Sequence, residues 1–244
     1  MKRYLLKFSV ILILGPVYMA LLGPIKLSGD WRTAPRHSTG ISPRADSNKD
    51  AIVQIFSART FNWRGIFGVH TWIAIKPSGG KQYTVHQVLG WRTWRNLPVV
   101  VSEQDEPDRS WYGNTPNILL DIRGDEATKL IPKIETAVKS YPYPNQYTIW
   151  PGPNSNTFVA WVARQVPQLG LALPTTAIGK DYLGNRIVDR APSGTGYQLS
   201  LLGLLGVTAA RTEGLEINVL GLNFGIDPFG LAIKLPGVGS IGIN

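Results

Sequence analysis

The 244-residue chain contains no cysteine, and this absence excludes several chemistries. The protein cannot form a disulfide, a cysteine-ligated zinc site, a lipid attachment through cysteine or a thiolate nucleophile. Histidine is also scarce, with three residues in all, and His37 lies in a polar stretch where we expect it to be solvated. The sequence shows no repeat with a period of 20–50 residues, so a solenoid is not expected.

Charge is sparse and unevenly placed. Charged residues make up 17% of the chain, yet the net charge is +9. The excess is largest near the N-terminus, where residues 1–50 contain eight Lys or Arg against three Asp or Glu. A protein that binds nucleic acid is expected to carry its basic residues on or beside the folded domain. The distribution therefore argues against nucleic acid as a partner and favours an anionic lipid surface.

Residues 1–27 have the features of a membrane anchor or a signal segment. A basic start, with Lys2, Arg3 and Lys7, precedes an uncharged and largely apolar run from Phe8 to Ile25. The run is long for a signal peptide and no convincing cleavage site follows it, which favours an uncleaved transmembrane helix over a cleaved signal or a buried core helix. The basic start then predicts a bacterial inner-membrane protein whose domain faces the periplasm, or a secreted protein if the segment is cleaved.

The rest of the chain divides into a polar linker, a folded domain and an apolar extension. Residues 28–50 are rich in Ser, Pro and Gly and predict a tether or a loosely packed strap. Residues 51–195 contain five β-rich runs and two helical segments, at about 125–140 and 155–166. Residues 196–244 are rich in Gly and Leu and predict two to four short strands, packed on the domain or on the membrane. We expect an α+β fold with an antiparallel sheet packed against the second helix.

Three polar residues are candidates for catalysis. His70 and His86 fall in two β-rich runs, and a hairpin that turns near residues 77–81 would place them opposite each other. Ser155 lies where an apolar helix begins, so it either caps that helix, as Asn154 also could, or acts as a nucleophile beside free backbone N–H groups. A core or surface position is the alternative for each histidine. No carboxylate near the two histidines completes a metal site, so we expect neither metal nor cofactor.

Three short segments resemble a known superfamily. "VHTWIAI", "TVHQV" and "NSNTF" occur in an order similar to that of the circularly permuted NlpC/P60 (papain-like) superfamily, over about residues 51–167. The segments "GVHTWIAIKP", "PGPNSNTFVAWVARQVP" and "TAIGKDYLG" also resemble a bacterial cell-envelope family of unknown function. The papain-like resemblance implies that His70 is the general base, that His86 orients it, and that Ser155 stands at the nucleophile position. That position holds cysteine in the superfamily, and a serine depends more heavily on its general base.

Two functions follow from these residues. The first is a non-catalytic module that binds a peptidoglycan, lipid or protein ligand of the cell envelope through a papain-like cleft. The second is a serine-variant hydrolase or acyltransferase that acts on an envelope amide or ester. Aromatic rings would stack on the ligand and arginines would pair with its anionic groups, although a solvated hairpin end is the alternative for residues 91–95. The predicted ligand-binding residues are Asn154, Asn156, Trp91, Arg92, Trp94 and Trp150.

Overall fold

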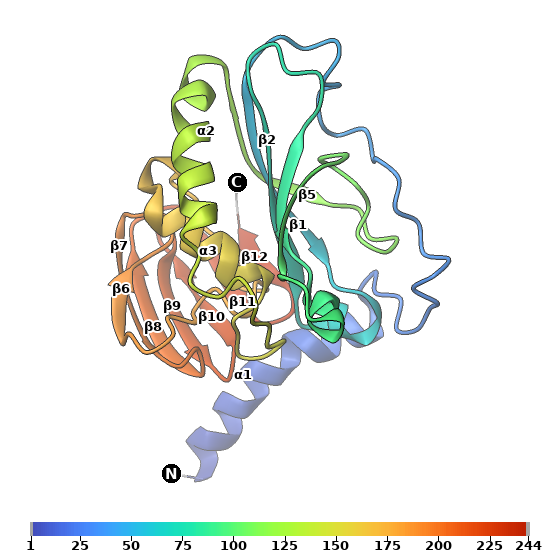
Figure 1. Ribbon diagram of the computed structural model, residues 1–244. Coiled ribbons are helices and arrows are strands. Elements are labelled where there is room, and N and C mark those ends of the chain that lie inside the picture. Colours follow the sequence, from blue (N-terminus) through green and yellow to red (C-terminus); the bar gives the residue numbers. More distant parts are fainter. Residues whose placement is uncertain (1, 243–244) are drawn as a thin grey trace.

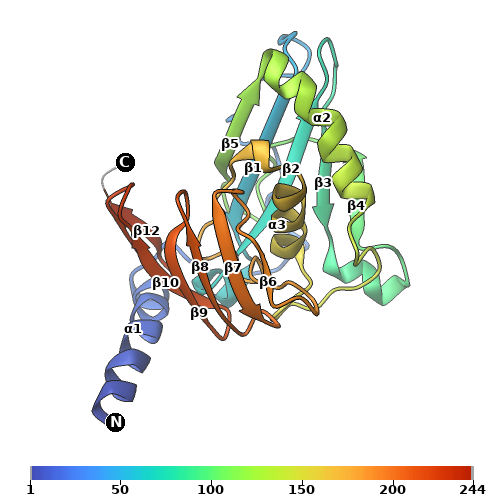
Figure 2. The same cartoon turned by 90° about the vertical axis from the view of Figure 1, so that its left-hand side faces the viewer.

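A computed structural model describes residues 2–242 of the chain, without the side chains of 2–9 and 11. Within these residues the fold contains two antiparallel sheets and three α-helices (Figure 1). The two sheets form separate layers, and two of the helices cover the five-stranded one (Figure 2). The predicted α+β class is confirmed.

The first sheet has five strands in the order β4-β3-β2-β1-β5. Its central strand β2 is buried along its whole length, which explains the nearly continuous apolar run of its sequence. The five predicted β-rich runs all form strands of this sheet. Their bounds are β1 (Ile52–Arg59), β2 (Val69–Lys76), β3 (Thr84–Val88), β4 (Val100–Gln104) and β5 (Asn117–Arg123).

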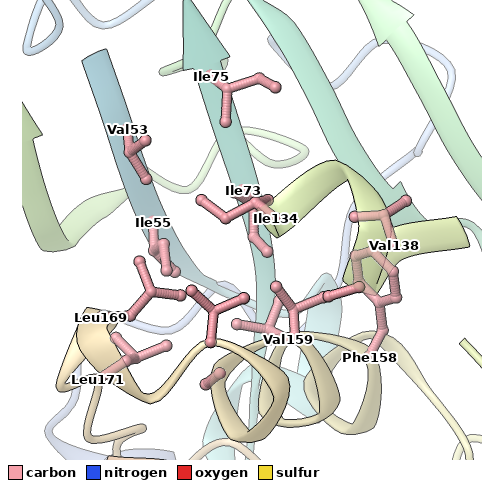
Figure 3. Packing of buried hydrophobic residues seen from close by; sticks show 14 of the residues in the cluster. Val53, Ile55, Ile73, Ile75, Ile134, Val138, Phe158, Val159, Leu169 and Leu171 are labelled. Carbon is pink, nitrogen blue, oxygen red and sulfur yellow. The ribbon is translucent and has the colours of Figure 1, made fainter. Parts of the chain in front are cut away.

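Two helices cover one face of this sheet and create the main hydrophobic core. They are α2 (Gly124–Lys139) and α3 (Ser155–Gln165), close to the predicted ranges. Each has an apolar stripe that points at the sheet, so that Ile134 of α2 and Phe158 of α3 are fully buried. Figure 3 shows these side chains interleaved with Ile73 and other residues of β1 and β2.

The opposite face of the first sheet is covered by irregular chain. The Tyr83 hydroxyl donates to the carbonyl of Pro43 at 2.9 Å, and the indole of Trp72 donates to the carbonyl of Pro107 at 2.8 Å. The ammonium group of Lys76 donates to the carbonyl of Asn48 at 3.0 Å. The polar segment 28–50 therefore lies against the sheet as a strap.

The second sheet is a meander of seven strands in sequence order. Six of these strands, all but the first, lie within residues 196–244, so the prediction of two to four strands there was too low. Short strands that are rich in glycine and joined by tight turns leave little alternating pattern in any one segment, so their number was hard to count. The strands are β6 (Val188–Arg190), β7 (Gly196–Leu201), β8 (Leu205–Ala210), β9 (Gly214–Val219), β10 (Leu222–Asp227), β11 (Ala232–Leu235) and β12 (Gly239–Gly242).

A buried ion cluster joins the second sheet to the rest of the protein. The ammonium group of Lys180 pairs with Glu216 of β9, and it lies 3.5 Å from the carboxylate of Asp181. Lys234 of β11 pairs with the other oxygen of Glu216 at 2.7 Å. Burial alone would lower the pKa of Lys180, but Asp181 and Glu216 outweigh it and raise this pKa. Burial would likewise raise the pKa of Glu216, yet the two lysines lower it.

Helix α3 takes part in the same contact between the layers. Its Arg164 donates to the side-chain oxygen of Gln198 on β7 at 2.5 Å and to the carbonyl of Lys180 at 2.9 Å. Asn223 of β10 donates to Asp181 at 2.7 Å. Charged and amide side chains from four strands, β7, β9, β10 and β11, thus complete each other's hydrogen bonds, as a buried polar contact requires.

The N-terminal helix α1 (Lys2–Leu21) packs at one edge of the second sheet, where Gly15 lies against the backbone of Pro236. Within residues 2–242, none of the helices combines the length and the apolar character needed to cross a bilayer. The predicted transmembrane helix is therefore not supported. The side chains of Lys2, Arg3 and Lys7, on which the predicted orientation depended, lie outside the described ones.

We expect Lys180→Met to lower the free energy of unfolding by about 3–5 kcal/mol, because Asp181 and Glu216 would lose a buried cation. Urea denaturation followed by tryptophan fluorescence measures the change. Lys129→Met is the matched control, since Lys129 is exposed on α2 and should change stability by less than about 0.5 kcal/mol. Equal stability of the two variants would show that the cluster contributes no net stabilisation.

Candidate functional site

The polar segment before α3 caps the helix through Asn154. The side-chain oxygen of Asn154 accepts hydrogen bonds from the backbone N–H groups of Asn156 at 2.9 Å and of Thr157 at 3.2 Å. The Thr157 hydroxyl in turn accepts from the Asn154 N–H at 3.1 Å, which completes a capping box. Gly179 packs so close to the Asn154 amide that any side chain there would collide with it, and its φ of +101° also favours glycine.

The next two polar side chains fasten α3 to its neighbours. The amide of Asn156 donates to the carbonyls of Val69 at 3.0 Å and Ile178 at 2.8 Å, and its oxygen accepts from the Thr71 hydroxyl at 2.9 Å. Thr157 donates to the carbonyl of Gly179 at 2.8 Å. Asn154 and Asn156, which were predicted to bind a ligand, thus use their amides within the fold.

Ser155 is the one residue of this segment whose side chain takes no part in these contacts. Within the described residues its hydroxyl has no hydrogen-bond partner, and the residue is 6% exposed. The cap is Asn154, so the interpretation of Ser155 as the capping residue was wrong. Its hydroxyl remains free for another role beside the first turn of α3, whose backbone N–H groups carry a partial positive charge.

His86 lies on the face of the first sheet that α3 covers. It pairs with Ile73 of β2, a residue of the main core, and with Ser102 of β4. Its Nδ1 lies 2.7 Å from the Ser102 hydroxyl, whereas its buried Nε2 has no partner among the described residues. Burial lowers the pKa of His86 to about 4, so the ring is neutral at pH 7.

His70 lies on the opposite face of the same sheet. It pairs with Ala58, its Nε2 lies 3.3 Å from the Gln87 side-chain oxygen, and its ring stacks on Trp111 with centroids 3.6 Å apart. Burial lowers its pKa to about 3, although the Gln87 contact acts the other way. The prediction that His70 opposes His86 was wrong, because Ile73 is the residue of β2 that opposes His86. Ile73 lies three residues after His70, and an odd shift along a strand places a side chain on the other face of the sheet.

The predicted group of His70, His86 and Ser155 is therefore not assembled as expected. Within residues 2–242, no hydrogen bond joins any two of the three. The helix-facing position next to His70 is occupied by Thr71, whose hydroxyl lies 3.4 Å from the Ser155 carbonyl oxygen. The neutral imidazole of His86 lies on the face of the first sheet that α3 covers, and α3 itself carries the hydroxyl of Ser155, which is unpaired among the described residues. The Ser102 hydroxyl contacts the imidazole and can orient it. The sequence offered no signal for Ser102.

Aromatic and arginine side chains gather at one end of the opposite face. We call this group the aromatic–arginine surface; its contacting members are Trp31, Arg36, Trp91 and Tyr112. Trp94 extends it, because it follows Trp91 by three residues in the 3-10 helix Gly90–Arg95, where side chains three positions apart lie on the same side. The rings of Trp91 and Tyr112 are 6.1 Å apart, and the guanidinium of Arg36 lies 4.3 Å above the Tyr112 ring and 6.0 Å from that of Trp31. Trp91 and Trp94 are 39% and 87% exposed, as expected for a contact surface.

The half-buried ring of Trp111 and the buried rings of His70 and Trp72 support this surface from beneath. The Trp111 ring is 6.0 Å from that of Trp91 and 5.1 Å from that of Tyr112. It also stacks on the His70 ring, which in turn stacks on the Trp72 ring with centroids 5.7 Å apart. His70 thus supports aromatic side chains instead of a nucleophile. Sequence reasoning missed Trp111, Tyr112 and Arg36 in this role, because the chain brings them to Trp91 from distant segments.

The remaining predicted ligand-binding residues, Arg92 and Trp150, make contacts within the protein. The Nε of Arg92 donates to the carbonyl of Pro98 at 2.6 Å, which holds this guanidinium at the edge of the aromatic–arginine surface. Trp150 donates from its indole to the carbonyl of Leu220 at 2.9 Å, at the turn between β9 and β10. Trp150 therefore joins the second sheet to the segment before α3.

Within residues 2–242, no group of three or more His, Cys, Asp or Glu side chains is arranged to hold a metal ion. The buried carboxylates of Asp181 and Glu216 are already paired with lysines. The chemistry on offer in the described part of the protein is that of hydroxyl, imidazole, aromatic and guanidinium groups.

The fold and the site define a small α+β protein in which a polar four-residue segment begins a helix that packs across antiparallel strands. The model of a family of proteins of unknown function, DUF3750, matches residues 50–182. This match covers 133 of the 244 residues, so the chain belongs to that family. It includes α3 and Lys180 but ends before β6. No curated protein and no solved structure matches the chain.

The two histidines should make the stability of the protein depend on pH. Each folded-state pKa lies below the ordinary value of 6.5, so the unfolded chain binds protons more readily. Stability should therefore fall as the pH drops from 6.5 towards 4, by about 2 kcal/mol per histidine at pH 5. Urea denaturation of the wild type, His70→Gln and His86→Gln at pH 7 and pH 5 tests this. A loss in the variants as large as that in the wild type would contradict it.

Proposed function

We propose that the protein is a non-catalytic binding module of the bacterial cell envelope, and that its ligand is an anionic glycan such as peptidoglycan. The observation that carries this proposal is the aromatic–arginine surface, where Trp91, Tyr112 and Arg36 lie in contact above the half-buried ring of Trp111 and the buried rings beneath it. Flat aromatic rings can stack on the apolar faces of sugars, and guanidinium groups pair with carboxylates. Rings that are held in place beforehand lose little entropy on binding.

The region around Ser155 supports a non-catalytic role. Asn154, Asn156 and Thr157 bond within the fold, and His70, the base that the resemblance implied, lies on the other face of the sheet. A helix that begins at Ser155 and packs on antiparallel strands agrees with a permuted papain-like origin. We include that origin in the proposal, with Ser155 at the former nucleophile position.

Peptidoglycan sacculi provide a direct test of the binding function. We expect the wild-type protein to co-sediment with purified sacculi and Trp94→Ala to bind about tenfold more weakly, because a fully exposed stacking ring is lost. The substitution leaves the core untouched, so circular dichroism should be unchanged.

Phe229→Ala is the matched control for this experiment. Phe229 is an aromatic residue that is also largely exposed, at 72%, but it lies in a turn of the second sheet. Its removal should leave binding to sacculi unchanged. Failure of the wild type to sediment, or equal binding by Trp94→Ala and the wild type, would rule out this surface as the glycan site.

A second candidate function is a serine hydrolase that uses Ser155 and His86. It is favoured by one observation: the Ser155 hydroxyl and the buried Nε2 of His86 both lack partners in the described structure and lie on the same side of the first sheet. Ser102 would orient the imidazole, which would accept the serine proton. A movement of α3 or β3 would have to bring the two groups into contact, since no hydrogen bond joins them.

Labelling with a fluorophosphonate probe separates the two functions. For a non-catalytic module we expect the wild type to label no more than Ser155→Ala, because an unactivated serine reacts poorly. Labelling that disappears in Ser155→Ala and His86→Gln but persists in His70→Gln would favour the hydrolase. His70→Gln serves as the matched control, since its histidine is equally buried on the opposite face.

A further inference from the structure

The second sheet turns its apolar side away from the protein. Along β7 the buried residues are Gln198 and Ser200, whereas Tyr197, Leu199 and Leu201 are exposed. Ordinary packing would place these two sets the other way round. The inversion follows from the buried ion cluster, because the inner face of this sheet meets Lys180 and its partners.

The same inversion runs across the whole sheet. Strand register places Leu199 beside Val207 and Val207 beside Ile217, and a second row runs from Tyr197 through Ala209, Leu215, Ile226 and Ile233 to Ile241. Most of these side chains are exposed. We call this set of outward side chains the apolar face. Among the outward-facing residues of the described strands of this sheet, the only charged one is Arg190, on the edge strand β6.

The apolar face is large for a single protein molecule. Seven strands about 4.8 Å apart, with three outward rows, give a surface of roughly 30 Å by 20 Å. Its projected area of about 600 Å² equals the upper end of the largest apolar patches on ordinary monomers. Patches of this size mark surfaces that bind a partner or a membrane.

Large apolar residues also occupy the turns of this sheet. Leu202, Leu220 and Leu231 have φ values of 54°, 53° and 45°, in the left-handed region where glycine and asparagine are usual. All three side chains are exposed, as is that of Phe229. Strained leucines at the tips of hairpins bring no benefit in water, but they would insert readily into lipid.

The charges around the apolar face fit an anionic partner. Arg190 on β6 and Arg211 in the turn between β8 and β9 are exposed beside it, whereas Glu213 and Glu216 are buried. Helix α1 contacts β11 at the edge of the same sheet; its sequence begins with the basic run "KRYLLK", and Ile13, Leu14 and Val17 are exposed on it. An apolar surface with arginines at its margin is typical of proteins that bind anionic lipid.

We propose that the apolar face binds the surface of an anionic lipid bilayer, with its side chains in the interfacial layer and the arginines at the headgroups. The contact needs no helix that crosses the membrane. A second copy of the chain is a less favourable partner for this face. Each copy carries a net charge of +9, and pairing two such faces would bring their arginines together, so the copies would repel each other. The proposal is independent of the glycan-binding function, which uses the other sheet.

The lack of cysteine allows a direct test of this contact with the full chain. Ala209→Cys places a single thiol in the middle of the apolar face, between Tyr197 and Leu215, and the thiol can carry an NBD fluorophore. Glu135→Cys on the exposed side of α2 is the matched control. With vesicles of phosphatidylcholine and phosphatidylglycerol (about 3:1), we expect a blue shift and brighter emission at position 209 only.

A second variant tests the energetic role of the same face. Leu199→Thr, Val207→Thr and Ile217→Thr together replace one exposed row with residues that also favour strands, so the sheet should persist by circular dichroism. We expect its binding to the mixed vesicles in flotation assays to weaken by at least about tenfold, because apolar area is lost. Trp94→Ala should bind vesicles as the wild type does.

Several results would overturn the lipid proposal. These are an unchanged NBD spectrum at position 209, a spectrum that shifts equally at 135, or vesicle binding by the triple variant equal to that of the wild type. A dimer in sedimentation equilibrium that the triple variant loses, without any vesicle binding, would assign the face to a second copy. Vesicle binding of equal strength to pure phosphatidylcholine would remove the role given to the arginines.

Discussion

The buried ion cluster determines how the two halves of this protein fit together. Two cations, Lys180 and Lys234, pair with the carboxylates of Asp181 and Glu216 in the layer between α3 and the second sheet. The guanidinium of Arg164 lies in the same layer and donates to Gln198 and to the carbonyl of Lys180. Such charges are tolerated away from water only when they are paired and hydrogen-bonded. The inner face of the second sheet must therefore be polar, and alternation along each strand then directs its apolar residues outward.

The sequence was informative where periodicity is strong and local. Five strands and two helices were predicted correctly, because β-branched runs and the stripes of residues such as Ile134 and Phe158 identify these elements. The number of strands in the meander was underestimated, because short, glycine-rich strands joined by tight turns leave little alternating pattern in any one segment. The register of β2 and β3 also could not be predicted, since the loop between them fixes it, and this error reversed the face assigned to His70.

The candidate site shows the same division between local and assembled features. "NSNTF" was correctly located at the start of a helix, although the cap is Asn154 and the hydroxyl of Ser155 is left without a partner. The aromatic–arginine surface, in contrast, is assembled by tertiary contacts between distant segments, such as those of Trp31 and Tyr112, which are 81 positions apart and both contact Arg36. A tryptophan can anchor a core or contact a ligand, depending on its exposure. That exposure is set by the tertiary structure and cannot be read from the sequence.

The capping segment has a consequence for how chains of this kind are compared. Asn154, Asn156 and Thr157 hold α3 to β2 and to Gly179, so this chain needs these residue types for its architecture whether or not any reaction is catalysed. A search that uses the four-residue pattern as a signature of hydrolases would therefore also collect chains in which the pattern serves only the fold. The informative positions are the two that the architecture leaves unconstrained: the hydroxyl of Ser155 and the Nε2 of His86.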